Sequence, residues 1–189
     1  EVFSIMALAQ HYGVPTRLLD WTRHPYIAAF FAAEDVYKNQ KKCCKCKDEK
    51  EYEDFLVVWA LYIPTFNRRI DSIDDNSYAV RVVTAPSATN PNLRAQQGVF
   101  TLANSKYTNE KLGTYKTLDV LLGEYEDAGR AADNYEQNPH IELAKITLPI
   151  SKAKKLLFLL SKWGITPSTV YPGYQSIVDD LRMQNYFLS

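Results

Sequence analysis

The sequence lacks a long apolar run and lacks a net charge, and each absence excludes a class of protein. No apolar run approaches the ~18 residues needed to cross a bilayer, and no secretory signal is visible. Lys and Arg number 22, as do Asp and Glu, so the chain as a whole is not attracted to nucleic acid or to acidic membranes. We therefore expect no membrane partner, and the net charge does not indicate nucleic acid.

Familiar phosphate-binding and catalytic motifs are also missing. There is no P-loop and no GxGxxG, the serines show no nucleophile elbow, and the aspartates do not have EF-hand spacing. The residues by themselves therefore predict neither a metal site nor a resident cofactor.

Cysteine is scarce, and its three copies are clustered at positions 43, 44 and 46. Such a cluster is no disulfide framework, and it favours a reducing compartment such as the cytoplasm. A structural zinc site needs four ligands, and adjacent Cys43 and Cys44 are an awkward pair for one ion. The surrounding residues 38–54 are almost wholly charged or polar, which predicts a solvated insertion.

The 189 residues are enough for one domain with a core, and 46% of them are hydrophobic. Apolar periodicity and turn residues predict four helices and four strands. Helices are expected over 3–12, 24–37, 151–163 (capped by Ser151) and 173–187, and strands over 55–63, 80–84, 99–103 and 141–148. The mixture predicts an α+β single domain with a central mixed or split β-sheet flanked by helices.

Residues 9–22, AQHYGVPTRLLDWT, hold the densest group of chemically capable side chains. Gly13 and Pro15 fix a sharp backbone path, and a strongly apolar helix with Phe30 and Phe31 follows. We expect Trp21 and both phenylalanines to lie in the core. A polar segment against a buried helix is either a polar core network or the wall of a site.

Individual residues of this segment also have structural interpretations. A single His such as His11 near the end of a helix usually interacts with the helix dipole. Arg17 and Asp20 are three residues apart and can pair with each other. Arg17 can instead present its planar guanidinium to a phosphate or carboxylate.

The segment resembles the FRG domain family, whose signature is similar to ALAQHYG.PTRLLDWT followed by a proline and an apolar helix ending in FFA. The match is nearly unbroken over 7–33, and two further blocks, at 92–103 and 164–182, resemble the family's middle strand and closing segment. The Phe-Arg-Gly motif that names the family is not in the chain. We therefore expect residues 1–189 to be an FRG-like domain that lacks its first strand.

The FRG core in turn resembles ADP-ribosyltransferases, which implies an ADP-ribosyltransferase-like fold with NAD as substrate. In that comparison Asp20–Thr22 match the second motif of those enzymes and residues 95–100 match the third. Gly98 then occupies the position of the catalytic Glu, and a Gln supplies a dipole but no charge. The site residues implied are His11, Arg17 and Gln96 as catalytic, and Tyr12, Gly13, Thr16, Asp20, Trp21, Thr22, Gln97 and Gly98 as ligand-binding.

Three functional hypotheses follow. The first is an intracellular bacterial FRG-domain protein that binds a nucleotide-like small molecule between residues 11–22 and 96–98. Its activity would be ADP-ribosyl transfer or a related NAD-dependent reaction on an unidentified macromolecular acceptor, in a toxin or anti-phage role implied by the family. The second is a non-catalytic module that binds a ligand or partner in the same cleft, which Gly98 favours. The third makes residues 9–22 a polar core only, which their dense charged and aromatic grouping disfavours.

Overall fold

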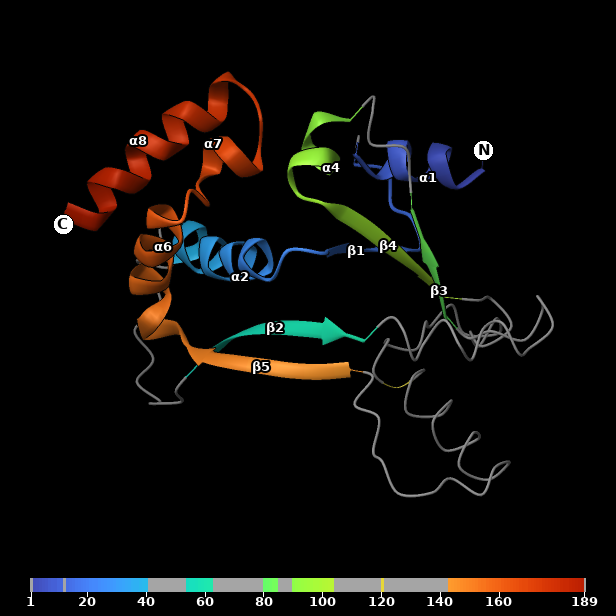
Figure 1. Cartoon of the computed structure of the whole chain (residues 1–189), viewed down its shortest axis with the longest axis horizontal. Helices are drawn as coiled ribbons and strands as arrows, with labels where there is room; N and C mark the ends of the chain where they lie inside the picture. Colours follow the sequence, from blue (N-terminus) through green and yellow to red (C-terminus); the bar gives the residue numbers. More distant parts are fainter. Residues whose placement is uncertain are drawn as a thin grey trace. The chain divides into compact units, whose positions relative to one another are not determined.

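A computed structural model describes residues 2–11, 13–40, 54–62, 80–84, 90–103, 120 and 143–188. The described elements are of α+β type, as predicted (Figure 1). They are α1 (Val2–His11), β1 (Leu18–Thr22), α2 (Pro25–Gln40), β2 (Phe55–Leu61), β3 (Val80–Val83), α4 (Pro91–Ala95), β4 (Gly98–Ala103), β5 (Leu143–Pro149), a 3-10 turn η2 (Ile150–Lys152), α6 (Ala153–Lys162), α7 (Pro167–Val170) and α8 (Tyr174–Leu188).

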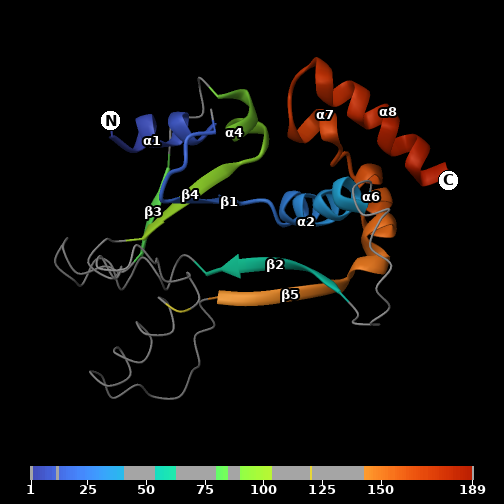
Figure 2. The ribbon, with the colours of Figure 1, turned by 180° about the vertical axis from the view of Figure 1, so that it is seen from behind.

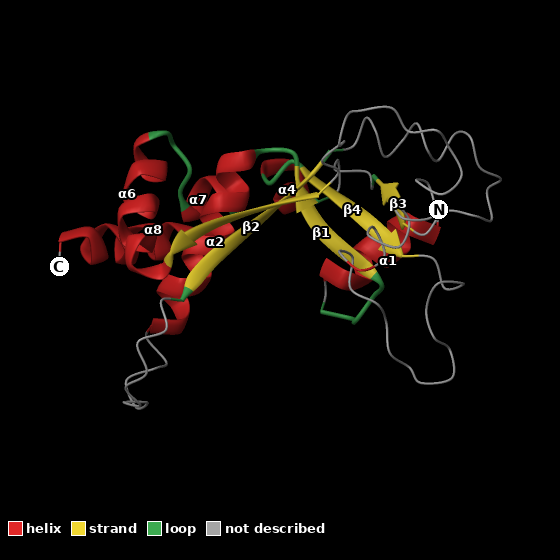
Figure 3. Cartoon of the chain, turned by 90° about the horizontal axis from the view of Figure 1, so that it is seen from below, coloured by secondary structure: helices red, strands yellow, loops and turns green. Residues whose placement is uncertain are grey.

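The described strands form two small sheets. One has the order β1-β4-β3, and the other pairs β2 with β5. β3 and β4 are antiparallel, with Val80 opposite Ala103 and Val83 opposite Phe100. β1 is a neighbour of β4 in this sheet and is also antiparallel to it (Figure 3). The strands expected around 55–63, 80–84, 99–103 and 141–148 are therefore confirmed, whereas β1 falls in a segment for which only a kinked path was expected.

The chain divides into two compact units. The first comprises residues 1–20, 59–85 and 99–144, and the second comprises residues 21–58, 86–98 and 145–189. In the first unit, α1 ends just before Gly13, which has a φ of 82°. The amides of Gly13 and Val14 donate to the carbonyls of Gln10 and Ala9, at 2.9 and 3.0 Å. This is the paired bonding of a Schellman cap, which satisfies carbonyls at the end of a helix.

The core of the second unit lies between α2 and the C-terminal helices. α2 and α6 pack side by side (Figure 1, Figure 2). Phe30 is fully buried, and Leu157 and Val170 are each 1% exposed. Phe31 packs at the edge of this cluster, and Trp21 is only partly buried and is not a member of it. The expectation that Trp21 lies in the core was therefore wrong, and Phe31 flanks the core without being fully buried.

Several boundaries differ from the sequence predictions. α2 continues to Gln40, so the first residues of the expected 38–54 loop are helical, and 41–53 lie outside the described residues. Lys152, not Ser151, is the N-cap of α6, because η2 precedes the helix. The apolar run that forms β2 is only partly buried, because Phe55 and Trp59 on it are 48% and 42% exposed. Within the described ranges, no helix is both long and apolar enough to cross a membrane.

Candidate functional site

Hydrogen bonds within the second unit join three segments that are distant in sequence. The Thr22 hydroxyl donates to the Gln96 carbonyl at 2.6 Å, across 74 residues of sequence. The Arg23 amide donates to the Gln97 carbonyl at 3.1 Å. The Gln96 side chain donates through Nε2 to the Val170 carbonyl at 3.3 Å. We call Thr22, Arg23, Gln96, Gln97 and Val170 the Gln96 junction.

The junction brings together the three sequence blocks that resemble the FRG family. Thr22 belongs to the block at 7–33, Gln96 to that at 92–103, and Val170 to that at 164–182. Two side chains make these contacts, those of Thr22 and Gln96, and the other partners are main-chain atoms. Thr22, a predicted ligand-binding residue, thus contacts the main chain of Gln96, and the convergence of His11 and Arg17 on Gln96 stays a prediction.

A short helix that the sequence analysis missed positions Gln96. Asn90 caps α4 by accepting from the Leu93 amide at 3.0 Å, and Pro91 occupies the first turn, where no amide donor is needed. Gln96 is the C-cap of α4, and β4 begins at Gly98, so Gln96 precedes the strand on which it was expected. Gln97 has a φ of 49°. A left-handed residue other than Gly is uncommon, and such residues gather at functional sites.

Gly98 is in tight contact with α4. A Cβ at this position would lie 2.3 Å from Leu93 Cδ1 and 3.3 Å from Leu93 Cγ. Leu93 itself is 9% exposed, so it has little room to move. The space from which a catalytic Glu side chain would extend is therefore filled by Leu93.

His24, a residue not predicted to act, lies beside the junction at the start of α2. Its amide donates to the Thr22 hydroxyl at 3.0 Å, and its carbonyl accepts from Ile27 and Ala28 at 3.0 and 3.2 Å. Its Nδ1 is buried and has no hydrogen-bond partner in the described part of the chain. The imidazole lies 5.7 Å from the Tyr26 ring, centroid to centroid. A buried polar atom without a partner costs about 1–3 kcal/mol, so this nitrogen is a candidate for a bound polar group.

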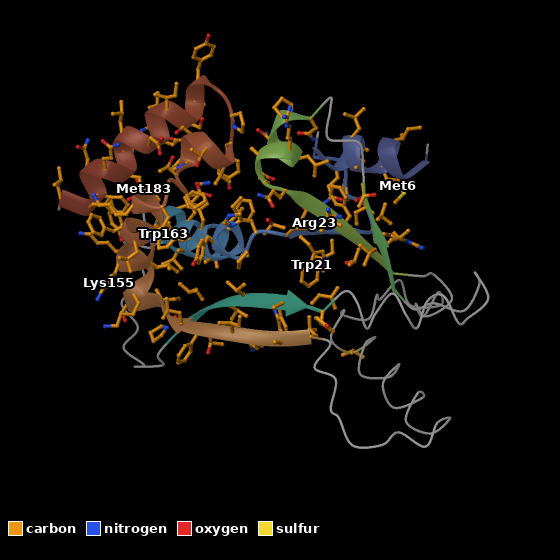
Figure 4. The ribbon with its side chains drawn as sticks, viewed as in Figure 1. Met6, Trp21, Arg23, Lys155, Trp163 and Met183 are labelled. Atoms are coloured by element: carbon orange, nitrogen blue, oxygen red, sulfur yellow. The ribbon has the colours of Figure 1, made fainter. Side chains whose placement is uncertain are left out.

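The remaining predicted site residues lie in or next to the first unit's N-terminal segment. Gln10 organises two of them, because it donates to Asp20 at 2.7 Å and accepts from the Thr16 hydroxyl. Arg17 is exposed, and Gly13 forms the helix cap. Tyr12 and the side chain of His11 lie outside the described residues. Figure 4 marks Trp21 and Arg23, where β1 leads into α2.

A second polar cluster in the second unit includes none of the predicted site residues. Glu34 is buried, and it accepts from the Tyr171 hydroxyl at 2.8 Å and pairs with Lys38 at 2.9 Å. The Lys38 ammonium also lies 5.4 Å from the centroid of the Tyr171 ring. Burial, and then the Glu34 carboxylate, raise the pKa of Tyr171 far above its ordinary value. All three groups are mutually satisfied, which is typical of a structural network.

The described residues do not gather three or more His, Cys, Asp or Glu side chains in a way that could hold a metal ion. Cys43, Cys44 and Cys46 lie outside the described residues.

The fold is thus that of an α+β protein whose candidate site is a turn between a short helix and a strand. Comparison with protein families supports the predicted resemblance: the FRG domain model matches residues 1–41. No curated protein and no solved structure matches the chain.

Proposed function

We propose that the chain is an FRG-domain binding module that holds a nucleotide-type ligand, of the NAD or ADP-ribose class, beside the Gln96 junction without transferring its ADP-ribose. The observation that carries this proposal is the contact between Gly98 and Leu93. Transfer requires a carboxylate that stabilises positive charge on the ribose, and position 98 has neither a side chain nor space for one.

The side-chain amide nitrogen and the main-chain carbonyl of Gln96 are also committed to structure. Its side-chain amide nitrogen donates to the Val170 carbonyl, and its main-chain carbonyl accepts from the Thr22 hydroxyl. An amide whose orientation is fixed by the fold can position a ligand, but it carries no charge that could replace a carboxylate. Both features favour binding over turnover.

Groups suited to a nucleotide lie next to the junction in the same unit. Arg23 is exposed, and a guanidinium is suited to phosphate oxygens. Tyr26 is 45% exposed and offers a ring face for a base. His24 Nδ1 is a buried nitrogen without a partner. Arg17, Asp20, Trp21 and the other residues of the N-terminal segment remain predicted ligand contacts.

Calorimetric titration of NAD and of ADP-ribose, combined with an assay for released nicotinamide, tests this proposal. We expect saturable binding without nicotinamide release. Arg23→Lys keeps the charge but loses the bidentate geometry, so it should weaken binding while the thermal midpoint stays constant. Arg94→Lys is the matched control, because Arg94 is an exposed arginine on α4. Release of nicotinamide by the parent protein would establish the enzyme instead, and absence of binding would reject both.

Arg17→Lys extends the same titration to the N-terminal segment. We expect lower ligand affinity with little change in stability. A variant that is grossly destabilised would show that Arg17 is part of a structural ion pair. A toxin or phage-defence role rests on the family resemblance alone and belongs to this proposal.

A further inference from the structure

The outer face of α6 combines lysines with large apolar side chains. Lys155, Leu159 and Lys162 are spaced by four and three residues, so they lie on one side of the helix. Both lysines are exposed, and Leu159 is 48% exposed. Trp163, the C-cap, is 72% exposed. Figure 4 marks Lys155 and Trp163, which lie toward opposite ends of the helix.

Aromatic side chains widen this face. Phe158 is 42% exposed, and the Lys162 ammonium lies 4.9 Å from the centroid of its ring. This places the alkyl stem of Lys162 along an apolar surface while its charged end stays accessible. The Trp163 ring lies 5.6 Å from that of Tyr26, which is itself exposed. We call Lys155, Phe158, Leu159, Lys162 and Trp163 the α6 face.

The charge of this face has one sign. α6 reads AKKLLFLLSK, without Asp or Glu, and a further exposed lysine, Lys152, precedes it. The balanced charge of the whole chain conceals this local excess. An occupant complementary to the face must therefore be anionic, and it must also accept Leu159, Phe158 and Trp163 out of water.

We propose that the α6 face docks on a lipid surface that contains anionic headgroups. Such a surface has headgroup phosphates outside and acyl chains beneath. The lysines of the α6 face can bind the phosphates, and its Trp, Phe and Leu side chains can enter the apolar layer. Protein interfaces are instead depleted in Lys. A nucleic acid would use the lysines, but it would gain nothing from Leu159. This docking does not depend on the proposed nucleotide binding.

Vesicle co-sedimentation of the whole chain tests the proposal, with phosphatidylcholine vesicles compared with vesicles that also contain phosphatidylglycerol. We expect binding to the anionic vesicles only, weakened by salt. The Lys155→Gln/Lys162→Gln variant should bind roughly 25-fold more weakly, since each lysine near such a surface contributes about fivefold. Arg94→Gln/Lys145→Gln removes the same charge from α4 and β5 and should leave binding unchanged. Leu159→Ser should weaken binding without altering the salt dependence.

Three outcomes would overturn the proposal. One is absence of binding to the anionic vesicles. Another is equal loss in the two double variants, which would show that binding follows net charge and not the α6 face. The third is preference for a single-stranded oligonucleotide in competition with the vesicles, which would assign the lysines to nucleic acid. Circular dichroism spectra of the variants show whether each is folded, and titration with ADP-ribose reports on the nucleotide site separately.

Discussion

The contact between Gly98 and Leu93 predicts how the chain responds to a single added methyl group. Gly98→Ala puts a Cβ 2.3 Å from Leu93 Cδ1, so Leu93 must move within a site where it is 9% exposed. Overpacking of this kind costs about 1–3 kcal/mol. Because the φ of Gly98 is not positive, Ala itself is unstrained, and lower entropy of the unfolded chain returns about 0.4–1 kcal/mol. The cost of steric overlap is larger than the gain from the unfolded chain, so we expect a net loss of about 1–2 kcal/mol in the free energy of unfolding.

A double-mutant cycle separates this overlap from other effects. Leu93→Ala removes both side-chain atoms that crowd the new methyl group and leaves only the Leu93 carbonyl, at an ordinary 3.5 Å. Adding Gly98→Ala to Leu93→Ala should then stabilise the protein by about 0.4–1 kcal/mol through the unfolded chain, so the two changes should be non-additive by the overlap term of about 1–3 kcal/mol. Urea denaturation gives all four free energies. Additive losses would refute the reasoning, as would a Gly98→Ala protein as stable as the parent.

Gly164→Ala is the control for backbone strain. Gly164 has a φ of 75°, and nothing lies within 4 Å of where its Cβ would be. Its substitution should cost about 1–2 kcal/mol through the backbone. Leu93→Ala should not rescue this loss, because the cause is conformational and not steric.

Three further predictions concern the core, the junction and the buried tyrosine. Phe30→Ala empties a fully buried position and should lower the unfolding free energy by about 3–5 kcal/mol, measured by denaturant titration; an unchanged midpoint would place α2 outside the core. Thr22→Val deprives the Gln96 carbonyl and the His24 amide of a partner, and should cost about 1–3 kcal/mol in the same assay, whereas Thr22→Ser should cost less. Because the fold raises the pKa of Tyr171 above its ordinary 10.0, the stability it contributes is intact below that pH and declines as the pH rises further. Tyr171→Phe should flatten this alkaline loss, and unchanged pH profiles would show that burial and Glu34 do not keep the phenol neutral.

Local patterns were enough to predict most of the described elements. Gly13 and Gly164 both end helices with a positive φ, because a left-handed residue is needed to satisfy the last carbonyls. The β-branched and aromatic run at 55–63 forms β2 for a similarly local reason. β1 was missed because LLDWT has no strand periodicity and depends on pairing with β4, which is far away in sequence.

The shortest helices and the candidate site needed information that periodicity does not carry. α4 and α7 have five and four residues, too few for an apolar repeat, although Asn90-Pro91 and Thr166-Pro167 are recognisable helix starts. The approach of Thr22 to Gln96 came only from family resemblance, because no local rule links residues 74 positions apart. His24 was missed because nothing in its local sequence marks its side chain as buried without a hydrogen-bond partner.

The distribution of contacts at the junction separates residues that hold the fold from residues that can hold a ligand. The side chains of Thr22 and Gln96 donate hydrogen bonds to main-chain carbonyls of the protein itself, so substitutions of these two residues should change stability first. Arg23 and Tyr26 are exposed, and His24 keeps an unpaired buried nitrogen, so substitutions there should change binding first. If a ligand-binding defect appeared only in variants of Thr22 or Gln96, and always with lost stability, the junction would be a scaffold. A defect confined to Arg23, His24 and Tyr26 at constant stability would instead make it the support of a binding site.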